Sequence, residues 1–211
     1  MANLQNLYDA VLGGNLNLAV STTKEAIAEG NIKPQEIIDN YMIKAMEEIG
    51  ARFETGKAFV PNLLMSARAM KGSLDLIKPL LKNGDIKPMG KIVIGTVEGD
   101  LHDIGKNLVS SMFEGCGFDV INLGVNVSGE KFVEAIKEHN PDIICMSALL
   151  TTTMNYMKEV ISALEVAGLR NKVKIMVGGA PVSQAYADQI GADGYSDNAN
   201  AAVALARLLL A

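Results

Sequence analysis

The second half of the chain alternates between two hydrophobic periods. Near-continuous apolar runs predict strands at 91–97, 118–124, 142–148, 174–180 and 192–197. Helical segments follow these runs in turn, at 105–115, 128–139, 152–168, 182–190 and 198–210. Strands that alternate with helices form parallel βαβ units with right-handed crossovers, and strands buried on both faces are apolar throughout. The pattern predicts a five-stranded, doubly wound parallel sheet of the flavodoxin-like type over residues 89–211.

Residues 1–88 have a different period, because their apolar residues recur at helical spacing. A first helix ends at Gly13-Gly14 and a second at Gly30, while Pro34 and Pro61 fit the first turns of a third and a fourth. Helices joined by short connections are typical of a small bundle. The sequence therefore predicts a four-helix domain over 1–88, followed by the α/β domain over 89–211.

Composition excludes several classes of protein. The net charge is -5 and no block of lysines or arginines is present, so nucleic-acid binding lacks its usual basic patch. The first residues have no signal-peptide pattern, and no apolar run is long enough to span a membrane. The two cysteines, Cys116 and Cys145, form no CxxC pair and suit a reducing compartment. A cytoplasmic protein without a membrane or nucleic-acid partner is expected.

The stretch "EGDLHDIG" follows the first predicted strand and contains His102, one of only two histidines. In doubly wound sheets, ligands bind beyond the carboxyl ends of the strands, where this stretch lies. Asp100 is close enough to accept a hydrogen bond from one ring nitrogen, which leaves the other nitrogen free to bind a metal. The N-terminus of the helix near Gly105 favours the neutral ring. These features predict a ligating histidine rather than an ordinary loop histidine.

One histidine cannot hold zinc or non-haem iron, which need three or four protein ligands. A metal bound through His102 must therefore bring most of its ligands with it, as in a macrocycle, and haem remains an alternative at this point. The third strand ends in four hydroxyl residues, Ser147, Thr151, Thr152 and Thr153, although a helix cap needs only one. The fourth strand ends in Gly178-Gly179, which indicates either a tight turn or a narrow slot.

These three motifs together resemble the cobalamin-binding modules. The family pattern D-x-H-x-x-G, S-x-L and G-G is matched by Asp100-Leu-His102-Asp-Ile-Gly105, Ser147-Ala-Leu149 and Gly178-Gly179, with similar spacing. In the first half, "RFETGKAFVPNLLMSARAMK" resembles the helical cap domain of the same proteins. The whole chain is similar to the corrinoid proteins of methylamine, methanol, methoxyaromatic and betaine methyltransferases, and to the cobalamin region of methionine synthase.

The resemblance implies a cobalamin or related corrinoid bound base-off, with His102 as the lower ligand of cobalt. Asp100 would bond the other ring nitrogen, and Thr153 stands where the family has a serine that completes a proton relay. Ser147 and Thr151 would contact the displaced benzimidazole tail in a slot near Gly178 and Gly179. Further implied cofactor contacts are Gly99, Asp103, Ile104, Gly105, Leu149 and Ala199. Phe53, Val60, Leu63 and Leu64 would cover the upper face of the corrin, or else form the core of the helical domain.

The same resemblance implies a methyl carrier that is not an enzyme by itself. Cob(I)alamin would accept a methyl group from a substrate:corrinoid methyltransferase, and a second methyltransferase would pass it to coenzyme M, a thiol, or to tetrahydrofolate. A reductive activation protein is the third expected partner. The helical domain would act as a lid with a hinge at 76–91. The alternatives are an adenosylcobalamin-dependent mutase subunit, which lacks its barrel here, a cobalamin-sensing module, which lacks a DNA-binding segment, and a response-regulator receiver.

Overall fold

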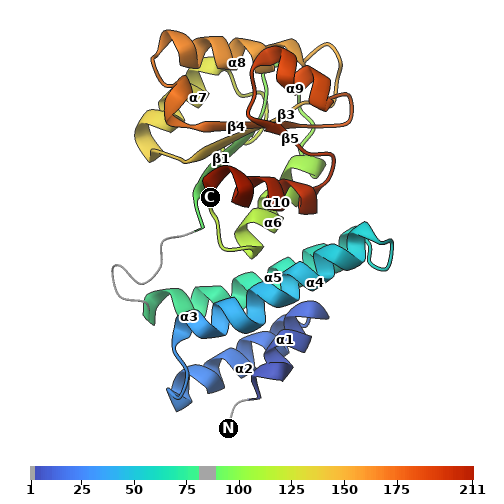
Figure 1. The fold of residues 1–211 in the computed structure, drawn as a ribbon, viewed down its shortest axis with the longest axis vertical. Helices are drawn as coiled ribbons and strands as arrows, with labels where there is room; N and C mark the ends of the chain where they lie inside the picture. Colours follow the sequence, from blue (N-terminus) through green and yellow to red (C-terminus); the bar gives the residue numbers. More distant parts are fainter. Residues whose placement is uncertain (1–2, 81–88) are drawn as a thin grey trace. The chain divides into compact units, whose positions relative to one another are not determined.

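The computed structural model describes residues 3–80 and 89–211, and Figure 1 shows its fold. The chain divides into two compact units, one made of residues 1–88 with 111–117 and the other of residues 89–110 with 118–211. Part of the predicted hinge, including Gly84 and Pro88, lies outside the described residues. Within the described ranges, no helix has both the length and the apolar character needed to cross a bilayer.

The α/β unit contains a five-stranded parallel sheet in the order β2-β1-β3-β4-β5. The strands are β1 (Lys91–Thr96), β2 (Asp119–Asn122), β3 (Ile143–Ser147), β4 (Lys174–Gly178) and β5 (Gly194–Tyr195). Thr96 pairs with Ser147, and Ser147 pairs with Gly178. The last residues of three neighbouring strands therefore form one row, so the loops that follow them start from the same edge of the sheet. This architecture confirms the predicted fold class.

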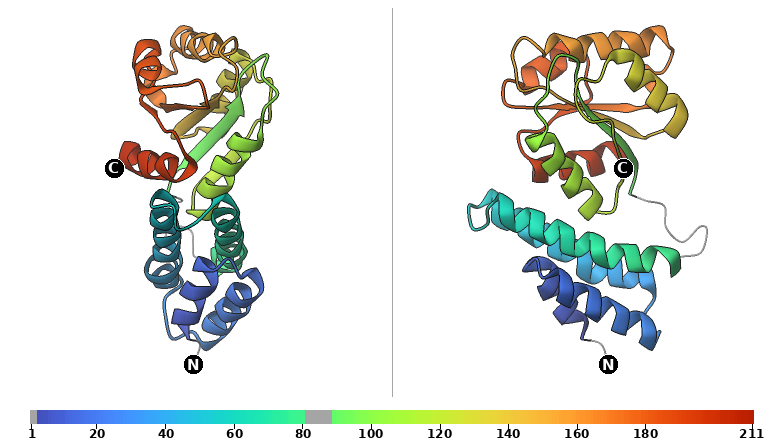
Figure 2. Two further views of the ribbon diagram at one scale, coloured as in Figure 1. Left: turned by 90° about the vertical axis from the view of Figure 1, so that its right-hand side faces the viewer. Right: turned by 180° about the vertical axis from the view of Figure 1, so that it is seen from behind.

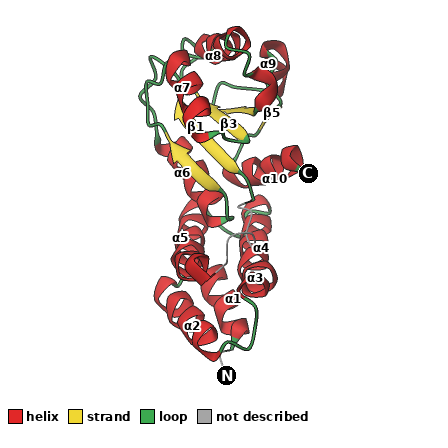
Figure 3. Ribbon diagram, turned by 90° about the vertical axis from the view of Figure 1, so that its left-hand side faces the viewer, coloured by secondary structure: helices red, strands yellow, loops and turns green. Residues whose placement is uncertain are grey.

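Helices cover both faces of this sheet (Figures 1 and 3). One face carries α7 (Gly129–His139), α8 (Asn155–Val166) and α9 (Gln184–Ile190), and the other carries α6 (Ile104–Gly115) and α10 (Ala199–Leu210). Side chains of the first three helices pack on the sheet in a core that includes Val93, Phe132, Ile144, Leu164 and Ile175. Most residues of β1, β3 and β4 are buried beneath these helices.

Residues 3–80 of the helical unit form four helical segments, as predicted (Figure 2). They are α1 (Leu4–Leu12), α2 (Leu16–Glu29), a third segment made of α3 (Pro34–Ile37), a π-helical turn (Ile38–Met42) and α4 (Ile43–Glu54), and finally α5 (Val60–Ile77), which runs into a short 3-10 turn (Lys78–Leu80). Asn3 and Asn15 cap the first two helices, and Gly30 ends α2 in the left-handed conformation. Gly13 and Gly30 follow the first two helices, and Pro34 and Pro61 lie in the first turns of α3 and α5, so these predicted boundaries are confirmed.

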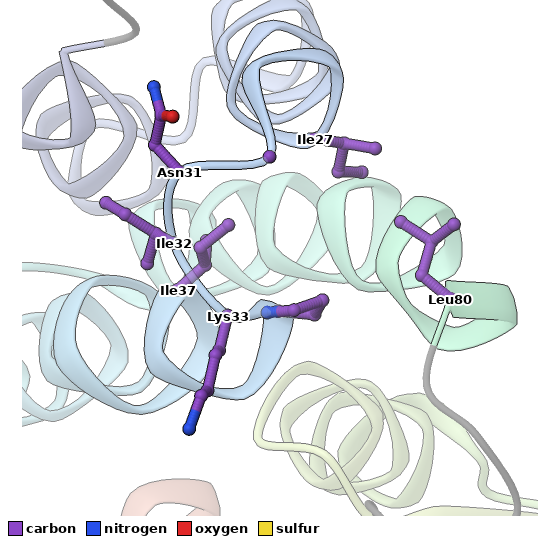
Figure 4. Close-up of a pocket in the computed structure, with 8 residues that line it drawn as sticks. Ile27, Asn31, Ile32, Lys33, Ile37 and Leu80 are labelled. Atoms are coloured by element: carbon purple, nitrogen blue, oxygen red, sulfur yellow. The ribbon is translucent and has the colours of Figure 1, made fainter.

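A pocket of about 310 Å³ opens in the helical unit, between the α2–α3 connection and the end of the α5 region (Figure 4). Its lining residues are Ile27, Gly30, Asn31, Ile32, Lys33, Pro34, Ile37 and Leu80. None of the site residues predicted from the sequence lines this pocket. The predicted ligand His102 lies instead in the loop between β1 and α6.

Candidate functional site

Asp100 lies at the centre of the loop between β1 and α6 and is completely buried. Its Oδ1 atom accepts a hydrogen bond from the backbone N–H of His102 at 3.1 Å and lies 2.7 Å from Nδ1 of the same residue. Its Oδ2 atom accepts hydrogen bonds from the backbone N–H groups of Leu149 at 2.7 Å and Leu150 at 3.2 Å, and from the Thr153 hydroxyl at 2.8 Å. One carboxylate therefore connects the histidine loop to the loop after β3.

The protonation state of Asp100 follows from these contacts. Burial alone would raise the pKa of this carboxyl, but the hydrogen bonds from the backbone of His102 and Leu149, and from the His102 and Thr153 side chains, hold the pKa well below its usual range. An ionised carboxylate only accepts hydrogen bonds, so Nδ1 of His102 must carry the ring hydrogen. The Nε2 atom then has a free lone pair, and the His102 side chain is 52% exposed.

Thr153 does not cap α8, although hydroxyl residues are common helix caps. The N-cap position of α8 is Met154, which makes no capping bond through its side chain. The Thr153 hydroxyl is buried and lies 2.8 Å from Oδ2 of Asp100 and 2.9 Å from the carbonyl oxygen of Leu150. The structure thus brings together all three members of the predicted His-Asp-hydroxyl relay, with threonine in the place of serine.

Large aliphatic side chains are exposed on both sides of the histidine. Leu101 and Ile104 flank it in the β1–α6 loop with 71% and 87% of their surface exposed, and Leu149 and Leu150 are exposed in the loop after β3. Sequence reasoning named Ile104 and Leu149 but missed the other two leucines. Their signal was available, since an aliphatic side chain inside a polar loop has no core to enter. Exposed apolar groups in a cluster typically mark a surface that binds a ligand or a partner.

The glycines of the motifs have different physical roles. A Cβ atom built at Gly105 would meet nothing within 4 Å, so the surface beside the start of α6 is open. By contrast, a Cβ atom at Gly179 would lie 1.9 Å from the carbonyl oxygen of Ala148, and the φ angle of 128° also favours glycine. The fold itself requires Gly179. Gly99 has a φ angle of 76°, in the left-handed region that favours glycine.

The other predicted site residues occupy varied positions. Ser147 is half-buried and Thr151 is exposed, and within residues 3–80 and 89–211 neither hydroxyl has a hydrogen-bond partner. Asp103 is exposed and accepts a hydrogen bond from Asn107 at 2.9 Å. Ala199 is buried at the start of α10, so its methyl group packs inside the unit. Gly178 ends β4 beside Ser147.

The four predicted covering residues belong to the helical unit. Leu63 is completely buried, Phe53 is half-buried, and Val60 and Leu64 are each exposed at the start of α5. Leu63 therefore has the packing expected of a core residue, whereas Val60 and Leu64 present apolar surface.

Two residues that sequence reasoning did not identify, Lys106 and Asn126, connect the start of α6 and the histidine loop to β2 and the loop after it. Lys106 is buried in the first turn of α6, and its Nζ atom donates to the side-chain oxygens of Asn107 at 2.6 Å and Asn122 at 2.8 Å. Burial lowers the pKa of Lys106. Asn126 contacts the backbone of the loop at Gly99 and Asp100. The contacts of Lys106 with Asn122 and of Asn126 with Gly99 join segments that are far apart in the sequence, so no local pattern predicts them.

A metal at this site needs ligands from outside the protein. Within the part of the chain that the structure describes, no group of three or more His, Cys, Asp or Glu side chains could hold a metal ion. The site offers one imidazole nitrogen, an apolar rim and open space beside Gly105. This donor set fits a flat macrocycle whose metal takes one axial ligand from the protein.

Family comparisons agree with this arrangement. Residues 90–204 match a B12 binding domain family, and residues 4–78 match a second B12 binding domain family. The chain is 46% identical over 209 residues to the dimethylamine corrinoid protein of Methanosarcina barkeri, a match that covers 99% of this chain and 97% of that protein. It is 44% identical over 204 residues to trimethylamine corrinoid protein 1 of Methanosarcina acetivorans, with 96% and 94% covered.

Solved structures give the same result. A cobalamin-binding protein from Desulfitobacterium hafniense is 32% identical, with a TM-score of 0.83 and 99% of both chains covered. The methanol:cobalamin methyltransferase complex of Methanosarcina barkeri contains a chain that is 30% identical with a TM-score of 0.85, covering 98% of this chain and 79% of that one. Because both halves match B12 binding domains and the full length aligns with methylamine corrinoid proteins, this chain belongs to the family of cobalamin-binding corrinoid proteins.

Proposed function

We propose that the protein binds its corrinoid base-off, with Nε2 of His102 as the lower ligand of cobalt, and carries methyl groups between methyltransferases. The observation that carries this proposal is the exposed His102 ring, whose Nδ1 is fixed by a buried carboxylate. A carboxylate that accepts a hydrogen bond from a ligating histidine orients the ring and sets its tautomer. The bound corrinoid supplies the chemistry, because its cobalt accepts a methyl group and releases it again.

The residues of the chain have distinct roles in this proposal. Asp100 holds the hydrogen on Nδ1 of His102 and aims Nε2 outward. Thr153 and the N–H groups of Leu149 and Leu150 keep Asp100 ionised. The exposed aliphatic side chains around His102 exclude water from the lower face of the ring system. Ser147 and Thr151, whose hydroxyls are free within the described residues, bind the displaced nucleotide tail.

We also propose that the methyl group comes from a methylamine and reaches this protein from a substrate:corrinoid methyltransferase in the cytoplasm. The relatives named for dimethylamine and trimethylamine support the methylamine class, but identities of 46% and 44% do not separate the two substrates. A second methyltransferase, acting on coenzyme M or tetrahydrofolate, removes the methyl group, and a reductive activation protein restores the reactive cobalt state. The protein is a carrier in this scheme, and its partners perform the catalysis.

The test of the lower ligand uses the protein labelled with ¹⁵N-histidine and loaded with corrinoid. Electron paramagnetic resonance of the cobalt(II) form should show splitting by one nitrogen, and the label should change it from a triplet to a doublet. The variant His102→Ala should lose this splitting. His139→Ala is the matched control, because His139 is the other histidine and is the last residue of α7, outside the loops that follow β1 and β3. A splitting that the ¹⁵N-histidine label does not change would show that the lower ligand is not a histidine.

The test of the methyl donor supplies the loaded, reduced protein with a methyltransferase for monomethylamine, dimethylamine or trimethylamine in turn. The visible spectrum of the corrinoid reports methylation. Methylation in only one mixture identifies the donor, while no methylation with any of the three would refute the methylamine class and leave corrinoid binding intact.

A further inference from the structure

Asn126 has a backbone conformation that few residues adopt. It lies in the connection between β2 and α7 with a φ angle of 54°, and it is one of two non-glycine residues with positive φ in the described parts of the chain. Left-handed backbone is uncommon outside glycine, although asparagine tolerates it better than most residues. Asn126 is exposed, so packing in the core does not explain its conformation. Such residues persist where surrounding contacts fix them.

The contacts of Asn126 reach directly into the histidine loop. Its side-chain oxygen accepts a hydrogen bond from the backbone N–H of Gly99 at 2.8 Å, and its own backbone N–H donates to the carbonyl oxygen of Asp100 at 3.0 Å. The next residue, Val127, donates to the carbonyl oxygen of Thr96 at 2.9 Å. One short segment after β2 therefore holds the loop at the end of β1 and again on both sides of the Gly99–Asp100 peptide.

These contacts constrain the backbone that carries the Asp100 side chain. Gly99 has a φ angle of 76° and no side chain. The N–H of Asp100 donates to the carbonyl oxygen of Val97 at 3.2 Å inside the loop, and the bonds with Asn126 fix the peptides on either side of it. The side chain of Asp100 in turn accepts a hydrogen bond from Nδ1 of His102. A rotation of the Gly99–Asp100 peptide would move the carboxylate, and the carboxylate would carry the imidazole with it.

We propose that Asn126 is a positioning residue for the cobalt ligand: by clamping the Gly99–Asp100 peptide, it sets the direction in which Nε2 of His102 faces. This role rests on the proposed function, because it concerns His102 as the lower ligand. Asn126 acts through the loop and touches neither the ring of His102 nor the carboxylate of Asp100 in any contact of the described structure.

Three forms of the protein separate the side-chain bond from the backbone conformation. Asn126→Gly keeps access to positive φ but removes the acceptor for the Gly99 N–H. Asn126→Asp keeps an oxygen acceptor in the same place, and aspartate also tolerates left-handed backbone. The inference therefore predicts a defect in Asn126→Gly and recovery in Asn126→Asp. Thermal unfolding of the cofactor-free proteins shows whether each variant is folded.

The first measurement needs no corrinoid. Hydrogen exchange at the amide of Gly99 should be about tenfold faster or more in Asn126→Gly than in the wild type, because the amide loses its acceptor. Exchange in Asn126→Asp should stay near the wild-type rate. Unchanged protection in Asn126→Gly would show that the clamp does not exist in solution, and would overturn the inference.

The second measurement uses the corrinoid-loaded proteins. Asn126→Gly should show a smaller fraction of cobalt(II) with imidazole nitrogen splitting and a corrinoid affinity lower by about tenfold, the low end for partners that orient a metal ligand. Asn126→Asp should restore both. Full splitting and affinity in Asn126→Gly would overturn the positioning role while the proposed function stands. No histidine splitting in the wild type itself would refute the proposed function, and the role of Asn126 with it.

Discussion

Replacement of Asp100 by asparagine tests the chemistry of the site because the two side chains have the same shape. The carboxylate accepts hydrogen bonds on both oxygens, whereas the amide offers one acceptor and one donor. The asparagine can therefore adopt two orientations. In the first, its oxygen faces His102 and its NH₂ group faces the loop after β3. In the second, these positions are exchanged. The relative costs of the two orientations decide what happens to the histidine.

The first orientation leaves the backbone N–H groups of Leu149 and Leu150 without their acceptor. An unmet donor costs about 1–3 kcal/mol, so the pair costs about 2–6 kcal/mol. The second orientation leaves only the backbone N–H of His102 unmet, at about 1–3 kcal/mol. The second orientation is therefore favoured by about 1–3 kcal/mol. The NH₂ group then faces Nδ1 of the ring, which must accept, so the ring hydrogen moves to Nε2 and blocks the metal-binding position.

We therefore expect Asp100→Asn to fold with about 1–3 kcal/mol less stability in urea unfolding, and to lose nitrogen splitting in the cobalt(II) spectrum. Corrinoid affinity should fall by about 10- to 100-fold. Asp119→Asn is the control, because Asp119 is exposed at the first residue of β2, the opposite end of the strand from the edge that carries the histidine loop. A variant at Asp100 that keeps both the splitting and the affinity would refute the tautomer argument.

The pH dependence of stability gives a further check on Asp100 in the cofactor-free protein. The folded-state pKa of Asp100 lies below its unfolded value, so its contribution to stability is fully present above the unfolded pKa of about 3.9. This contribution is lost as the pH falls from there toward the folded-state pKa. The wild type should lose stability below about pH 4 more steeply than Asp100→Asn, which has no group to protonate at this position. Parallel curves for the two proteins would contradict the pKa assignment.

Three further outcomes are expected. Thr153→Val should lose about 1–2 kcal/mol in urea unfolding because Asp100 loses a donor, and Thr153→Ser should stay near the wild type. The free energy of unfolding of Lys106→Met should lie within about 1 kcal/mol of the wild type at neutral pH. At alkaline pH the wild type should become more stable relative to this variant. Burial lowers the folded-state pKa of Lys106, so its deprotonation removes a buried charge. Leu63→Ala should lower the free energy of unfolding by about 2–5 kcal/mol, because Leu63 is completely buried. Leu64→Ala should lower it by under about 1 kcal/mol, so this variant can test the expected covering role: the methylated variant should photolyse faster than the wild type.

The fold was predictable because its signals are periodic and local. Runs of apolar residues fixed the existence and order of the strands, and a parallel sheet with right-handed crossovers leaves few ways to connect them. The boundaries were less predictable. The helix expected from residue 152 begins at Asn155, because residues 151–154 form a turn in which Thr153 is bonded to Asp100 of the β1–α6 loop. A contact between distant segments overrode the local preference there.

The site was predictable only where its parts are close in the sequence. Asp100 and His102 are two residues apart, so their hydrogen bond could be foreseen. The partners of the other oxygen of Asp100 lie about fifty positions later, and only the pairing of Thr96 with Ser147 brings that loop alongside. Asn126 escaped prediction for the same reason.

Glycine was ambiguous for a different reason. Gly105 and Gly179 read alike in the sequence, as positions where a side chain is missing. In the structure, the first faces open space and the second is required by contact with the backbone of Ala148. An absent side chain can leave room for a ligand or for the protein itself, and only the neighbouring atoms distinguish these cases.

The arrangement around Asp100 also determines which nitrogen of the His102 ring offers a lone pair. A buried carboxylate is unfavourable unless hydrogen bonds offset its lost hydration, and here donors reach both of its oxygens. Asp100 therefore stays ionised at neutral pH, and the hydrogen on Nδ1 of His102 stays in its hydrogen bond. The lone pair of the ring therefore lies on Nε2, the exposed atom that we propose as the cobalt ligand.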